Sequence, residues 1–190
     1  MHARWQLSAA ARELKPLRQG ELDGLCGLYS IINAVRLASF PRRLRKPEVK
    51  LLFEAGLRIL SSTRRLRYIL ADGMYDHMWE RMSSAVLAEA ALNHDQELML
   101  IDLLACAKVR STRDAHRALR TALHSGMPTL VTLTGSYDHW TVISSYTKAR
   151  YQLFDSWGYH WIGTQNVELA DSDNVATHGL ARALALKRVE

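Results

Sequence analysis

The stretch Gln19–Val35, "QGELDGLCGLYSIINAV", places a single cysteine, Cys26, at the start of an apolar pattern. Apolar residues recur at the intervals of one face of an α-helix, and Pro41 prevents the helix from continuing, so the spacing predicts a buried helix over 26–38. The residues that form this face are Leu28, Ile31, Ile32 and Val35. Cys26 would then lie in the first turn of the helix.

Cys26 has two interpretations that its position alone leaves open. At a helix N-terminus the partial positive charge and the free amide groups favour a thiolate, which suits a nucleophile. An unpaired cysteine is also a small apolar side chain that packs well in a core. For the first interpretation, Gly24 and Gly27 leave space beside Cys26 through which a substrate backbone can approach.

The sequence pattern changes from helical to β-rich along the chain. Helical patterns cover 46–60, 72–93 and 111–126. Short runs with β-branched or alternating apolar residues cover 127–135, 139–146, 150–157 and 181–189, and 97–105 is a further candidate strand. Helices first and strands afterwards indicate an α+β fold, with an antiparallel sheet against a helical layer. We predict one domain over 1–190, with a helical lobe over about 20–125 and a β lobe over about 126–190.

The composition is that of a folded protein without a membrane span. The chain has 190 residues, of which 48% are hydrophobic and 23% are charged, and its longest apolar runs are short and flanked by charge. It starts without the apolar segment of a secretory signal, which predicts a cytoplasmic protein and leaves export by a signal-independent route open. Cys26 and Cys106 are too few for a disulfide scaffold, so we expect both to be reduced.

Basic residues gather in the first third of the chain. The formal net charge is +6, and residues 1–70 hold 14 Lys and Arg against 5 Asp and Glu, mostly in the clusters 42–46 and 64–67. A solvated helix surface explains such clusters, and so does a docking site for an acidic protein. We do not expect nucleic acid as a partner, because neither interleaved aromatic residues nor a nucleic-acid motif accompanies the clusters.

Two further segments carry candidate catalytic side chains. His139 lies in "SYDHWTVI", at the start of a predicted strand, and Asp155 lies in "LFDSWG", at the end of the next one. Antiparallel pairing of 139–145 with 150–156 would place the carboxylate beside the imidazole and fix its tautomer. Taken singly, His139 is as well explained as a surface or core histidine, and Asp155 as a turn residue. Together with Cys26 they supply a thiol, a base and a group that orients the base.

Gln19 stands seven residues before Cys26, on the loop that enters the predicted helix. Its side-chain amide and the backbone N–H of Cys26 would form a pair of donors for a developing oxyanion. A lone glutamine on a loop is otherwise simply solvated. Its place in the order Gln, Cys, His, Asp gives Gln19 weight as a fourth catalytic candidate.

These segments resemble the papain-like cysteine peptidases. The resemblance depends on Gln19 and Cys26-Gly27 at the start of a helix, on Asp138-His139 before an apolar strand, and on "DSWGYHW" over 155–161, which is similar to the family's Asn-Ser-Trp-Gly…Trp stretch. The absence of a prodomain and of disulfide cysteines makes the chain similar to the compact, reduced branches. Examples are bacterial cysteine-peptidase effectors, leader-peptide processing domains and ubiquitin-like-protein hydrolases.

The resemblance implies a papain-like fold, in which the helix of the nucleophile packs against the antiparallel sheet. It implies Cys26 as nucleophile, His139 as general base and acid, and Asp155 as orienting residue in place of the usual asparagine. Gln19 would be the oxyanion donor. The residues expected to bind substrate are Gly24, Gly27, Asp138, Trp140 and Trp157.

The function expected from these residues is hydrolysis of a peptide or isopeptide bond through an acyl-thioester intermediate, with deamidation and transpeptidation left open. The partner would be a protein or peptide, and the basic first third is compatible with an acidic one. We expect neither a cofactor nor a metal, because no CxxC, HxxxH or HExxH spacing occurs. The alternative is a non-catalytic binding module, a degenerate peptidase fold that docks an acidic protein or nucleic acid through its basic first third.

Overall fold

The computed structural model describes residues 2–20, 23–94, 96–170 and 178–189. The helices in these ranges are α1 (His2–Glu13), α2 (Cys26–Ser39), α3 (Lys46–Ser61), α4 (Leu66–Asp72), α5 (Asp76–His94), α6 (Leu103–Cys106), α7 (Thr112–His124) and the 3-10 helix η1 (Thr164–Asn166). The strands are β1 (Leu98–Asp102), β2 (Thr129–Gly135), β3 (His139–Tyr146), β4 (Arg150–Leu153), β5 (Trp161–Gly163), β6 (Val167–Leu169) and β7 (His178–Arg188). Among the described residues, no helix combines the length and the apolar character needed to cross a membrane.

The strands form one mixed but mainly antiparallel sheet, in the order β1-β7-β2-β3-β4-β5. The first part of the long strand β7 pairs with β6 in parallel, and its last part pairs with β1 in antiparallel fashion. The predicted pairing of β3 with β4 is antiparallel, with a register shift between Ile143 and Ser145. Helices and an antiparallel sheet in one chain confirm the α+β fold class.

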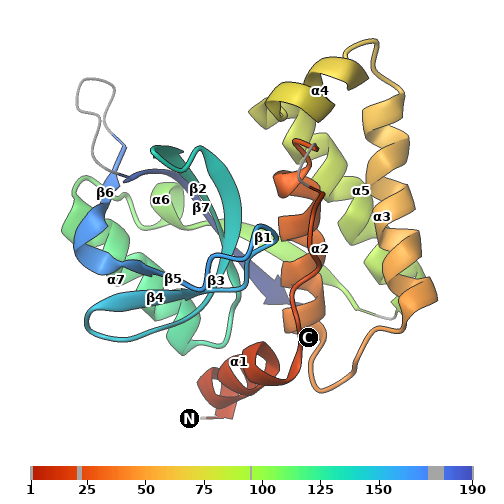
Figure 1. The fold of residues 1–190 in the computed structure, drawn as a ribbon. Helices are drawn as coiled ribbons and strands as arrows, with labels where there is room; N and C mark the ends of the chain where they lie inside the picture. Colours follow the sequence, from red (N-terminus) through yellow and green to blue (C-terminus); the bar gives the residue numbers. More distant parts are fainter. Residues whose placement is uncertain (1, 21–22, 95, 171–177, 190) are drawn as a thin grey trace.

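Helices cover the sheet on two sides (Figure 1). On one side α2 packs on β3, and α3 and α5 pack against each other and against α2. On the other side α6 and α7 pack on the strands. The sheet therefore begins at Leu98, and α7 packs against it. Strand β1 and helix α7 both lie within 20–125, the range that the sequence assigned to the helical lobe. Periodicity identifies a helix but not the layer to which it belongs.

The helix α2 runs from Cys26 to Ser39, as the apolar spacing predicts. The face that carries Leu28, Ile31 and Ile32 is fully buried, because it meets both the sheet and the neighbouring helices. Pro47 lies at the start of α3 and Ser111 caps α7, so the start signals at these helices are also confirmed. The short elements α1, α4, β5 and β6 carried no signal that we recognised.

Trp79 of α5 joins the helical layer to the sheet. Its ring stacks on Trp140 of β3, with centroids 4.2 Å apart and planes 2° from parallel. Its indole N–H donates to the backbone carbonyl of Gly27 at 3.3 Å. Since Gly27 follows Cys26 and Trp140 follows His139, this buried tryptophan fixes the two candidate catalytic segments relative to each other.

Candidate active site

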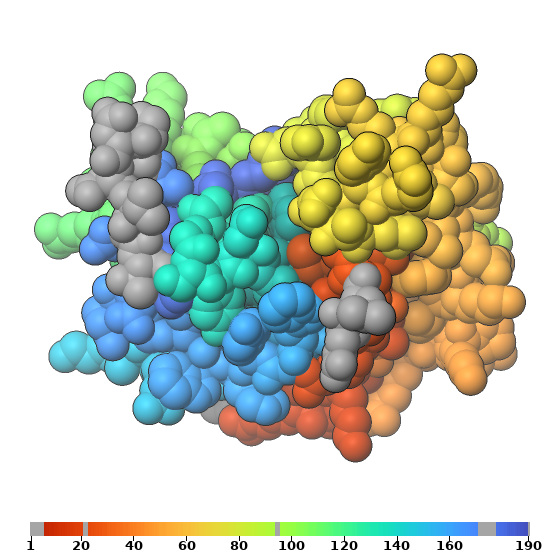
Figure 2. Space-filling view, turned by 45° about the horizontal axis from the view of Figure 1, so that its top comes forward, coloured from red at the N-terminus to blue at the C-terminus, as the bar shows by residue number. Residues whose placement is uncertain are grey.

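A cavity of about 450 Å³ lies where the start of α2 meets the start of β3, and both Cys26 and His139 line it. One wall is the α4–α5 connection, and the other includes Asp138 on the β2–β3 connection. Figure 2 shows these two segments, yellow and teal, on either side of a hollow in the surface. The cavity places the predicted nucleophile and base side by side and open to a ligand.

His139 and Asp155 form a buried pair beside Cys26. The ring N–H at Nε2 donates to Asp155 Oδ1 at 2.7 Å, and both side chains are almost fully buried. Both residues lie beyond the same end of the antiparallel β3–β4 pairing, which joins 143–146 to 151–153. Because Nε2 is engaged by the carboxylate, Nδ1 is the ring nitrogen left to exchange a proton with the Cys26 thiol.

The second oxygen of Asp155 organises the turn that follows β4. Asp155 Oδ2 accepts backbone N–H groups from Trp157 at 2.8 Å, Gly158 at 2.8 Å and Tyr159 at 3.1 Å. Gly158 has φ +102°, and a Cβ there would come within 2.0 Å of the Arg18 guanidinium, so only glycine suits this position. The sequence "DSWG" over 155–158 therefore consists of the Asp155 carboxylate and the turn whose backbone N–H groups hold it.

The pKa values of the pair move apart. Burial lowers the pKa of His139, but hydrogen bonding and charge at Asp155 and Cys26 outweigh burial and raise it to about 9. Burial raises the pKa of Asp155, but the hydrogen bond and the charge of His139 outweigh burial and hold it below its usual value. The pair is therefore an imidazolium and a carboxylate at neutral pH, and Cys26 is within the hydrogen-bonding neighbourhood of that imidazolium.

The loop before α2 is held by its own side chains and by α4. Asp23 accepts the backbone N–H of Gly20 at 2.7 Å with one oxygen and that of Leu25 at 3.2 Å with the other. The backbone N–H of Gly24 donates to Leu70 of α4 at 2.6 Å. These contacts fix the point where the chain enters α2, and so leave Cys26 half-buried rather than sealed in the core.

Gln19 lies between this loop and the Asp155 turn. Its side-chain N–H donates to the Asp23 carbonyl at 3.0 Å, and its side-chain oxygen accepts the Ser156 hydroxyl at 2.8 Å. One amide hydrogen has no partner in these two bonds, since the amide group carries two. The contacts tie Gln19 to the residue after Asp155, and its role as oxyanion donor stays a prediction.

Gly24 and Gly27 do not leave open space beside Cys26, so the expectation that a substrate backbone approaches through them is wrong. A Cβ on Gly24 would lie 2.8 Å from the Ile69 carbonyl, and one on Gly27 would lie 2.6 Å from the Trp79 ring. Both glycines permit close packing of the protein on itself. The space beside Cys26 comes instead from the gap between the α4–α5 connection and β3.

The other predicted substrate-binding residues divide into three cases. Asp138 is exposed, lines the cavity and adopts φ +34°, a left-handed conformation that aspartate tolerates. Trp140 also lines the cavity, although its stacking on Trp79 leaves it only 5% exposed. Trp157 is 55% exposed and does not line this cavity, but its ring lies 5.4 Å from that of His139 and so covers one side of the buried pair.

The sequence did not indicate the α4–α5 connection, which adds most of the remaining cavity lining. Asp72 and Asp76 flank it, at the end of α4 and the start of α5, and with Asp138 they make three carboxylates in the lining, where none of the described residues is a Lys or an Arg. The letters "DGMYDH" over 72–77 carry no catalytic spacing, so only the fold brings them to Cys26. In the described part of the chain, no group of three or more His, Cys, Asp or Glu side chains is arranged to hold a metal ion.

The basic cluster 42–46 is engaged within the protein. Arg42 contacts Glu48 at 2.6 Å, Arg45 contacts Glu48 at 3.3 Å, and Arg43 pairs with Glu13. Glu48 is buried, and these pairs neutralise part of the charge that a docking partner would meet. Most of the cluster lies on the connection between α2 and α3, so the expected helix surface is wrong, and its ion pairs do not favour a vacant docking site.

A thiol, an imidazole and a carboxylate in this order form a chain along which a proton can pass from sulfur to nitrogen while the carboxylate holds the ring. The cavity beside these three groups is accessible, and the residues that carry the groups come from segments far apart in the sequence. Comparison of the chain with protein-family models, with curated proteins and with solved structures found no match. The chemistry of the site therefore has to be argued from its geometry.

Proposed function

We propose that this protein is a thiol hydrolase of the papain-like type, which cleaves a peptide or isopeptide bond through Cys26, His139 and Asp155. The observation that carries the proposal is the buried His139–Asp155 pair, at 2.7 Å, next to a cysteine that starts a helix and lines a cavity. A structural histidine needs no such combination. The arrangement of α2 against the antiparallel sheet supports a papain-like organisation.

In the first half of the proposed cycle, the Cys26 thiolate attacks the scissile carbonyl carbon while His139 holds the proton. The backbone N–H of Cys26 and the remaining amide hydrogen of Gln19 stabilise the oxyanion. As the intermediate collapses, the C–N bond breaks and His139 gives its proton to the departing amine. The products of this half are a free amine and an acyl-thioester on Cys26.

In the second half, a water molecule attacks the thioester carbonyl. Neutral His139 takes one proton from that water, the C–S bond breaks, and the acid product leaves. The proton stays on His139, which restores the ion pair with the thiolate. Asp155 keeps the ring oriented in both halves, because its two oxygens are fixed by His139 and by the following turn.

Alkylation of the two cysteines tests the proposal directly. Cys106 is exposed and Cys26 is only half-buried, so accessibility alone predicts faster modification of Cys106. We expect iodoacetamide at mildly acidic pH to modify Cys26 first, since His139 is placed to take the proton of the Cys26 thiol as the sulfur attacks, whereas no such base is proposed for Cys106. Peptide mapping by mass spectrometry gives both rates in one sample, and Cys106→Ala confirms the assignment. Faster modification of Cys106 would contradict the proposal and favour a non-catalytic binding module.

Turnover provides the second test. Cleavage of a fluorogenic peptide library, and of peptides joined by a lysine isopeptide bond, should be abolished in Cys26→Ala and retained in Cys106→Ala. Cys26→Ala should also leave the melting temperature nearly unchanged, since the side chain is partly exposed. Full activity of Cys26→Ala toward every cleaved substrate would rule out Cys26 as the nucleophile.

A further inference from the structure

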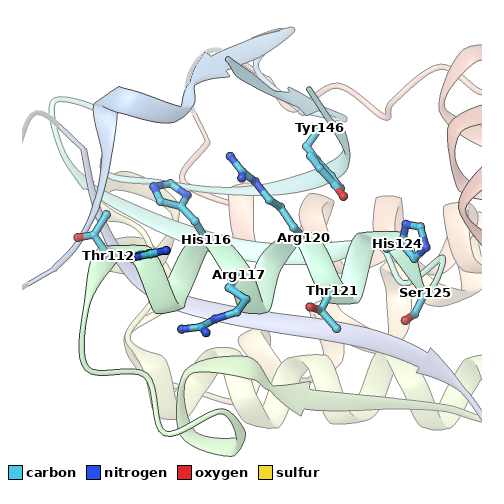
Figure 3. A pocket seen from close by; sticks show the side chains of 9 residues that line it. Thr112, His116, Arg117, Arg120, Thr121, His124, Ser125 and Tyr146 are labelled. Atoms are coloured by element: carbon cyan, nitrogen blue, oxygen red, sulfur yellow. The ribbon is translucent and has the colours of Figure 1, made fainter. Parts of the chain in front are cut away.

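A second cavity, of about 720 Å³, lies over α7. Three arginines, two histidines and four hydroxyl-bearing residues line it, and the described residues contribute no Asp or Glu to the lining. Figure 3 shows His116 and Arg120 rising from α7 toward Tyr146, at the end of β3. The cavity is separate in its residues from the cleft at Cys26.

The charge of this cavity comes from one helix. Arg113, Arg117 and Arg120 recur at intervals of three and four residues and all line the cavity; in Figure 3 Arg120 rises on the side of Tyr146, whereas Arg117 points the other way. Arg117 pairs with Asp114 on its own turn, whereas Arg113 and Arg120 make no ion pair with any described residue. Like charges at this spacing repel one another, and an anion placed between them would remove the repulsion.

Arg120 presents a donor that the protein leaves unused. Its Nε is buried and has no hydrogen-bond partner among the described residues, while its guanidinium carbon lies 5.7 Å from the centre of the Tyr146 ring. A buried donor without an acceptor is costly, and most such donors in folded proteins are satisfied. Arg120 also lines the cavity, so its guanidinium charge would attract an anion placed there.

The environment of His116 shows that the electrostatic potential in this cavity is positive. Its Nδ1 lies 2.5 Å from the hydroxyl of the fully buried Tyr151, which fixes the ring. Burial lowers the pKa of His116, and the charge of Arg120 lowers it further. The ring is therefore a neutral side chain beside a guanidinium, in a site whose described lining residues include no Asp or Glu.

We propose that this cavity binds a small molecule carrying two or more phosphate groups. Guanidinium groups and hydroxyls match phosphate oxygens in geometry, and the spread of Arg113, Arg117 and Arg120 along the helix calls for more than one anionic group. The volume is that of a small-molecule site. Nucleic acid is disfavoured because Tyr146 is the one Phe, Tyr or Trp among the described lining residues, and Arg120 already covers its ring.

Calorimetric titration of the full chain with inorganic triphosphate tests this proposal. We expect saturable binding that weakens about tenfold in the double variant Arg113→Gln/Arg117→Gln, because two charge-assisted contacts are lost. Both side chains are exposed, so the variant should fold. The matched control is Arg110→Gln/Lys148→Gln, which removes the same charge from exposed positions outside the lining and should bind like the wild type.

Further titrants distinguish the ligand classes. Triphosphate should bind more tightly than a single-stranded oligonucleotide or an oligo-aspartate peptide of matched charge. The proposal is overturned if triphosphate does not bind, if either polymer binds more tightly, or if the control variant weakens binding as much as the test variant.

Nuclear magnetic resonance locates the binding without any variant. The imidazole signals of His116 should shift on addition of triphosphate, while those of the exposed His160, outside the lining, should not. Equal shifts of the two histidines would mean diffuse attraction to the surface and would contradict a built site.

Discussion

His139 and His116 occupy two regions of opposite charge. Burial lowers the pKa of both side chains. The pKa of His139 nevertheless rises to about 9 beside Asp155 and Cys26, whereas the pKa of His116 stays below its usual value beside Arg120. Three aspartates line the cleft of His139, and three arginines line the cavity of His116. The neighbouring charge, rather than the burial, therefore decides which histidine holds a proton at neutral pH.

The comparison also changes the expectation about partners. The basic first third of the chain suggested an acidic substrate, but the cleft that would hold the scissile bond is lined by carboxylates. Arg113 and Arg120, which make no ion pair with a described residue, line the α7 cavity, in the part of the chain where acids outnumber bases. Net charge along the sequence does not give the charge of a site.

The largest effect expected is on catalysis by His139. His139→Asn removes the group that carries the proton and should lower kcat/KM about a thousandfold, the scale of a lost general acid and base. The control is His160→Asn, at an exposed histidine outside the cavity lining, which should keep wild-type activity. Comparable losses in the two variants would show that His139 has no special place in the reaction.

Asp155→Asn should give the next largest loss, about a hundredfold in kcat/KM, because asparagine has one acceptor oxygen where two are used. If that oxygen keeps the three turn amides, the NH₂ group faces His139 Nε2 and forces the wrong tautomer. Asp155→Ala should also unfold more easily, since it leaves the amides without an acceptor. Activity of Asp155→Asn equal to that of the wild type would show that the carboxylate is not required.

The two histidines should have opposite effects on the pH dependence of stability. His139 binds its proton more tightly in the folded state, so its contribution is full below its unfolded pKa of about 6.5 and is lost as pH rises through about 9. The free energy of unfolding should fall by up to ~1.4 kcal/mol per pH unit in that window. His116 contributes above its unfolded pKa, and that contribution is lost as pH falls through its lower folded pKa.

Urea unfolding at a series of pH values measures both contributions. His139→Asn should reduce the decline of the unfolding free energy at alkaline pH, and His116→Asn should reduce its decline at acidic pH. If the alkaline decline is unchanged in His139→Asn, the ion pair with Asp155 is not its source.

The smallest expected effect is on the choice of substrate. The carboxylates of the cleft should favour substrates with a lysine next to the scissile bond over those with a glutamate, severalfold at low salt and less at high salt. Asp72→Asn/Asp138→Asn should reduce this preference. Glu97→Gln/Glu168→Gln, at exposed positions outside the lining, removes the same charge and should not. A preference for glutamate in the wild type would contradict this interpretation of the cleft.

The sequence by itself determined the local parts of the candidate site. The apolar spacing after Cys26 places it at the start of α2, because a helix needs only its own periodicity and a terminating proline. The alternating runs around His139 and Asp155 determine the β3–β4 pairing, since these strands are adjacent in the chain. These features depend on contacts between near neighbours in sequence.

Only the tertiary structure decided what surrounds these residues. Trp79 stacks on Trp140, the turn after α4 brings Asp72 to the cleft, and α7 places Arg120 against Tyr146. Each of these contacts joins segments that are far apart in the chain, and each depends on how whole layers pack. Local propensity contains no information about that packing, because the same helix face can meet core, solvent or ligand.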